Sequence, residues 1–126
     1  MDEVSLADEL GDEFAELQKE FLDTTRARVH ELVRLLAVAG GETPSGTDGE
    51  TFRRIAHSVR GSGGSYGFDA ISAVAGELEK AYLGGEATSR LAELVENLSA
   101  TVAQIVETTL GTSGSIEIPA TPETAG

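Results

Sequence analysis

The residues with the clearest potential for chemistry are a histidine and three arginines near the middle of the chain. His57 lies in the segment RRIAHSVRGSGGSYGF, residues 53–68, together with Arg53, Arg54 and Arg60. A guanidinium one helical turn away disfavours the protonated imidazole, and the neutral imidazole is the nucleophilic form. Because the guanidinium fork also suits phosphate oxygens, these residue types fit a site that accepts a phosphoryl group and passes it on.

Glycines follow this histidine closely, so the segment could be either a helix or a loop; they are Gly61, Gly63, Gly64 and Gly67. A glycine inside a helix costs roughly 0.5–1 kcal/mol relative to alanine. On one helix over residues 50–67, the apolar side chains gather opposite His57, whereas Gly61 and Gly64 lie on its side. These apolar residues are Phe52, Ile55, Val59 and Tyr66.

The shared phase of these side chains predicts that the helix continues through its glycines. Gly61 and Gly64 then let the surface of another protein approach the imidazole, and Gly63 lets a neighbouring helix pack closely. The alternative is a helix that ends near Gly61 and is followed by a flexible loop.

Apolar residues recur at helical spacing over most of the chain and predict an all-α fold. We expect an antiparallel four-helix bundle with a short extra N-terminal helix that ends at Gly11 and packs across one end of the bundle. The expected helices cover residues 4–10, 12–39, 50–67, 69–83 and 86–110. Thr47 or Asp48 can cap the third of these helices. The aromatic residues expected in the core are Phe14, Phe21, Phe52 and Tyr66.

The composition limits the domain organisation and the classes of partner. Residues 1–110 form one helical domain, and residues 111–126, rich in Thr, Ser, Gly and Pro, are expected to be a flexible tail or linker. The net charge of -13 argues against nucleic acid and anionic membranes as partners. The absence of cysteine, of a signal peptide and of a long apolar run fits the cytoplasm. With two histidines and no cysteine we expect no metal site, and no nucleotide or other cofactor motif is present.

The segment HSVRGSGGSYGF, residues 57–68, resembles the signature of histidine-containing phosphotransfer (HPt) domains: His, two residues, Lys, Gly, five residues, Gly. It is also similar to the phosphoacceptor domain of chemotaxis histidine kinases. The resemblance implies that His57 is the phosphoacceptor, through Nε2, and that Arg60, where the family usually has lysine, contacts the phosphoryl group. It also implies that Gly61 gives room to the partner and that Gly67 ends or bends the helix.

The resemblance implies a phosphocarrier rather than an enzyme, which exchanges the phosphoryl group with an aspartate of a response-regulator receiver domain. A sensor or hybrid histidine kinase is the other implied partner, and Arg53, Gly61 and Gly64 are expected to face the docked protein. We expect a monomer, either free-standing or the phosphoacceptor domain of a larger chemotaxis-type kinase.

Two other interpretations of these residues remain. The chain could be a helical-bundle adaptor that binds a signalling partner without chemistry. A hydrolase using a nearby serine is disfavoured, because the sequence offers no orienting carboxylate and no nucleophile elbow. The second histidine, His30, lies on a polar helix face and is expected to be solvated.

Overall fold

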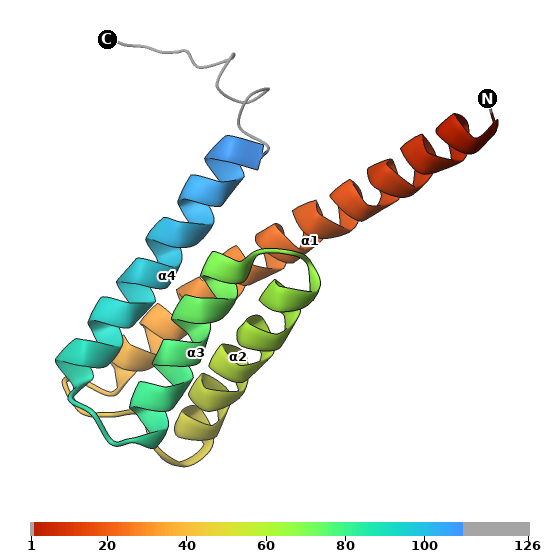
Figure 1. Cartoon of the computed structure of the whole chain (residues 1–126). Coiled ribbons are helices and arrows are strands. Elements are labelled where there is room, and N and C mark those ends of the chain that lie inside the picture. Colours follow the sequence, from red (N-terminus) through yellow and green to blue (C-terminus); the bar gives the residue numbers. More distant parts are fainter. Residues whose placement is uncertain (1, 110–126) are drawn as a thin grey trace, which may run out of the picture.

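The structure is a computed structural model that describes the backbone of residues 2–109 and the side chains of residues 11–108. The chain forms four helices, α1 (Asp2–Val38), α2 (Gly46–Ser65), α3 (Asp69–Leu83) and α4 (Thr88–Thr109) (Figure 1). Each helix packs against the next one, and α1 also packs against α4, so the helices close a four-membered ring. The all-α prediction is therefore confirmed, whereas the predicted tail, residues 111–126, lies outside the described residues.

The core is built from the apolar stripes of all four helices. Leu22, Leu32, Phe52, Ile71, Leu78, Leu91 and Leu98 are completely buried. Ile71 and Leu78 are seven residues apart, as are Leu91 and Leu98, and this spacing keeps one face of each of these helices toward the centre. Burial of such side chains contributes about 1.5–3 kcal/mol each, and this stabilises the helix that carries His57.

The prediction of a separate N-terminal helix is wrong, because α1 continues through Gly11. A single glycine costs about 1 kcal/mol in a helix, which is not enough to end one that has good helix formers on both sides. The N-terminal part of α1 therefore extends beyond the turn between α2 and α3 instead of packing across the end of the bundle (Figure 1).

This extension also changes the environment of Phe14, which we expected in the core, and of its neighbour Leu17. Phe14 is 43% exposed and Leu17 is 45% exposed. Gln18 donates a hydrogen bond to the carbonyl of Tyr66 just after the end of α2, so residues before Gln18 lie at or beyond that end. Phe14 still contacts the Tyr66 ring, at 6.3 Å between ring centroids, and Tyr66 is half-buried rather than buried.

Glycines follow the ends of three of the helices. Gly40 and Gly41 follow α1, Gly67 follows α2 and Gly85 follows α3, all with positive φ. The start of α2 differs from the prediction, because the helix begins at Gly46 with Ser45 at its N-cap instead of Thr47 or Asp48. The helix α3 has the predicted bounds, and α4 begins two residues later than expected, at Thr88, while its predicted last residue, 110, lies outside the described residues.

The prediction that Gly63 allows close packing is confirmed. A Cβ on Gly63 would lie 3.1 Å from the backbone nitrogen of Ser72 and 3.4 Å from Cγ2 of Ile71, both in α3. A Cβ on Gly61, two residues earlier in the same helix, would have no atom within 4 Å. Close contact between α2 and α3 therefore depends on Gly63, whereas Gly61 leaves the opposite surface open.

We expect Gly63→Val to lower the free energy of unfolding by about 1–3 kcal/mol, because the added methyl groups overpack the contact with α3. Gly61→Val introduces the same change in helix propensity but no new contact, so its stability should stay within about 0.5 kcal/mol of wild type. Urea denaturation followed by circular dichroism measures both values. Equal effects at the two positions would contradict a tight contact at Gly63.

Candidate functional site

His57 lies on the exposed side of α2, opposite the buried face of that helix. Its side chain is 57% exposed, whereas Phe52 and Val59 of the same helix are buried. The helix continues from Gly46 to Ser65, so the prediction that it survives its glycines is confirmed and the loop alternative is wrong. Between residues 51 and 65 the helix carries three arginines and no acidic residue. The imidazole is therefore presented to solvent from a rigid and locally basic element.

A carboxylate from the neighbouring helix holds the imidazole ring. Oε2 of Glu79, in α3, lies 3.0 Å from Nδ1 of His57. The ionised carboxylate can only accept a hydrogen bond, so this contact selects the tautomer that carries its proton on Nδ1. Nε2 is then the nitrogen with a free lone pair, and it is the nucleophilic atom of the ring.

Arg60 lies against the same carboxylate through its other oxygen. Its Nε is 3.2 Å from Oε1 of Glu79, and its Nη2 is 3.5 Å from Nδ1 of His57. The stem of Arg60 crosses α3 at Gly76, where a Cβ would lie 3.0 Å from its Cδ. Ser72 donates a hydrogen bond of 2.7 Å to the Arg60 carbonyl, which fixes the helix backbone at this level. The guanidinium is thus held beside the imidazole, with half of its side chain exposed.

Arg53, which we expected to face a docked protein, makes two ion pairs within the domain. Its guanidinium lies 3.1 Å from a carboxylate oxygen of Glu50 and 3.7 Å from Oε2 of Glu79. Its side chain is 31% exposed, against 49% for Arg60. Glu79 itself is only 12% exposed and is shared by the histidine and both arginines.

Space in front of the site is left by two of the predicted glycines. Gly61 and Gly64 are exposed, and a Cβ on Gly64 would have only the Ser72 hydroxyl nearby, at 3.7 Å. Gly67 has a φ of 85°, a conformation that L side chains rarely adopt, and it turns the chain between α2 and α3. The surface next to His57 therefore carries no side chains at Gly61 and Gly64 that would block the approach of another protein, as the sequence predicts.

A comparison with protein-family models finds a match to the Hpt domain over residues 16–108. The chain belongs to the Hpt domain family. Hpt domains are phosphocarriers that exchange a phosphoryl group with receiver domains and histidine kinases in phosphorelays. Searches of curated proteins and of solved structures returned no match.

The residue of this Hpt domain that sequence reasoning missed is Glu79, with Gly76 and Ser72 beside it on α3. These three residues lie at spacings of four and three, so they share one stripe of the helix next to its buried face. That stripe faces Arg60 and His57 of α2. The spacing alone could have identified a polar stripe, but only the register between α2 and α3 shows that it meets the histidine.

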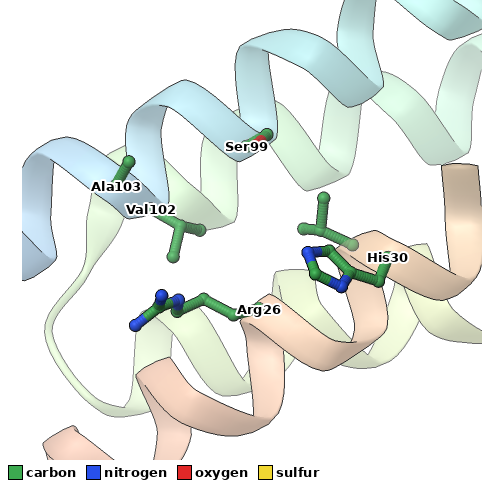
Figure 2. Close-up of a pocket in the computed structure, with 6 residues that line it drawn as sticks. Arg26, His30, Ser99, Val102 and Ala103 are labelled. Carbon is green, nitrogen blue, oxygen red and sulfur yellow. The ribbon is translucent and has the colours of Figure 1, made fainter.

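The other histidine lies in a different part of the Hpt domain. His30 is exposed in a shallow groove between α1 and α4, as predicted for a solvated residue (Figure 2). The groove is lined by Arg26, Val29, His30, Ser99, Val102 and Ala103. Unlike His57, His30 has no carboxylate hydrogen-bonded to its ring among the described side chains.

Two further searches of the described part of the chain concerned metal sites and membrane-spanning helices. Within the described residues, no group of three or more histidine, cysteine or acidic side chains is arranged to hold a metal ion. Among the same residues, no helix combines the length and the apolar character needed to cross a bilayer.

Proposed function

We propose that His57 is the phosphoacceptor of this Hpt domain and exchanges its phosphoryl group with an aspartate of a response-regulator receiver domain. The observation that carries the proposal is the contact between Glu79 and Nδ1, which leaves Nε2 of an exposed imidazole as the nucleophile. Gly61 adds to it, because the next helical turn offers open space to an incoming domain. Arg60 is the proposed contact for the phosphoryl oxygens.

In the proposed step, the Nε2 lone pair attacks the phosphorus of an aspartyl phosphate. The N–P bond forms while the P–O bond to the aspartate breaks, and the aspartate leaves as a carboxylate. Positive charge develops on the imidazole ring as its nitrogen bonds to phosphorus. Glu79 stabilises this charge through the hydrogen bond from Nδ1–H. The reverse transfer uses the same contacts, so the domain can pass the group in either direction.

The arrangement also explains why a small donor should work without a partner protein. Positioning of the ring and its tautomer is built into the bundle, while the receiver contributes its own aspartate and surface. Phosphoramidate therefore tests the chemistry of His57 separately from docking, because it transfers a phosphoryl group to imidazole and releases ammonia. A receiver domain then tests the onward transfer.

We expect the chain to become labelled on incubation with phosphoramidate, with the label mapped to the peptide that contains His57. The bond should be labile in acid and stable in alkali, as a phosphoramidate bond is, and receiver domains should remove the label and carry it on aspartate. Mass spectrometry of the digested protein and phosphate-affinity gels provide the readouts. Label on His30, or receivers that bind without any transfer, would contradict the proposal, and the second result would favour an adaptor.

A further inference from the structure

We propose that Arg53 is a positioning residue that keeps the Glu79 carboxylate hydrogen-bonded to His57 when Arg60 leaves that carboxylate for the phosphoryl group. The inference rests on the proposed function of His57. It concerns Arg53, which the sequence placed in partner docking, and assigns it a role inside the site. It also explains why one carboxylate is shared by two arginines.

The two arginines contact different oxygens of Glu79. Arg60 contacts Oε1 at 3.2 Å, whereas Arg53 lies 3.7 Å from Oε2, the oxygen that also accepts from His57 at 3.0 Å. When Arg60 leaves, Oε1 of Glu79 loses its ion pair, whereas Oε2 keeps both the hydrogen bond from His57 and the nearby charge of Arg53. The division of contacts allows one arginine to move without disturbing the imidazole.

Arg60 is the arginine that can move. Its side chain is 49% exposed, and its guanidinium already lies 3.5 Å from the imidazole. Arg53 is less exposed, and Glu50 anchors it at 3.1 Å. A phosphoryl group adds a charge of about −1.5 to −2 beside the ring, so it attracts the more mobile guanidinium.

The phosphoryl charge also creates a problem that Arg53 solves. Glu79 is mostly buried, and a carboxylate without a positive partner is repelled by a phosphoryl dianion a few ångströms away. If both arginines were absent from Glu79, the carboxylate would turn away from Nδ1, and its hold on the imidazole would weaken. Arg53 keeps one positive charge on Glu79 throughout the transfer.

The test is a double-mutant cycle on the full chain, in which Arg60→Gln imitates the state where Arg60 has left Glu79. The ¹⁵N chemical shifts of the His57 ring report the fraction protonated on Nδ1, and phosphoramidate labelling reports the rate. In the Arg60→Gln background, Arg53→Gln should lower the Nδ1–H fraction clearly, whereas in the wild-type background its effect should be small. Arg53→Gln alone should slow labelling about fivefold, since labelling passes through the state that lacks the Arg60 contact.

Two comparison variants separate positioning from a structural role. Arg53→Lys restores a positive charge next to Glu79 and should recover most of the labelling rate. Arg90→Gln removes an arginine that also pairs with two glutamates, both within α4 or just before it, and should leave both readouts unchanged. Thermal melts should give the same midpoint for all four proteins that carry one substitution.

If Arg53→Gln changed the Nδ1–H fraction of His57 equally in both backgrounds, or in neither, the proposed role of Arg53 would be overturned. Failure of the wild-type chain to label would instead contradict the proposed function. The ring shifts need no phosphorylation, so they would still decide whether Arg53 holds Glu79 against His57. The two proposals therefore fail by different observations.

Discussion

Replacing His57 with glutamine is expected to abolish phosphoryl labelling and leave the bundle folded. The glutamine amide has nearly the size of the imidazole but no nucleophilic lone pair, so no N–P bond can form. The side chain of His57 is 57% exposed and takes no part in the core, so the free energy of unfolding should change by less than about 0.5 kcal/mol. Labelling by phosphoramidate and by phosphorylated receivers, compared with a thermal melt of the same sample, measures both effects.

The matched control for this substitution is His30→Gln. It also removes an exposed histidine from a helix, and it should label at the wild-type rate, because its groove between α1 and α4 contributes nothing to the site on α2. If the label persisted in His57→Gln and disappeared in His30→Gln, the phosphoacceptor would be His30, in the groove between α1 and α4, and the assignment of His57 would be overturned.

The success of the sequence analysis on α2 has a physical reason. The phase of a helix is fixed by its own apolar residues, so Phe52 and Val59 on one side place His57 on the other before any neighbour is known. The range predicted for α3, residues 69–83, also agrees with the structure, and Gly84 directly after it is an equally local stop signal. Local rules therefore sufficed for the exposed position of His57 and for the open surface beside it.

The failures have a different origin. Phe14 follows the apolar spacing of α1, but its burial depends on where α2 ends, which the sequence of α1 does not contain. Glu79 is separated from His57 by 22 residues and reaches it only because Gly63 and Gly76 set the distance and register of α2 and α3. The burial of Phe14 and the contact between Glu79 and His57 both depend on how two helices pack together, and the spacing of apolar residues within one helix does not contain that information.

This dependence makes Glu79→Gln the second substitution with a large expected effect. The amide retains the size of the carboxylate and can still accept from Nδ1–H, but it carries no charge. It therefore cannot balance the positive charge that develops on the imidazole during phosphorylation. It also leaves Arg60 without its carboxylate partner and Arg53 with Glu50 alone.

We expect Glu79→Gln to slow labelling of His57 by about 10- to 100-fold, by analogy with the loss seen when the hydrogen-bonded partner of a metal-ligating histidine is removed. Initial rates with phosphoramidate measure this effect without a partner protein, and ring ¹⁵N shifts should show a larger fraction protonated on Nε2. Glu77→Gln removes an exposed carboxylate from the same helix and should leave the rate unchanged. Equal rates for Glu79→Gln and Glu77→Gln would mean that the exposed imidazole reacts without an orienting group. The contact with α3 would then serve the fold alone, whereas a selective loss at Glu79 would show that the register of two helices prepares the nucleophile.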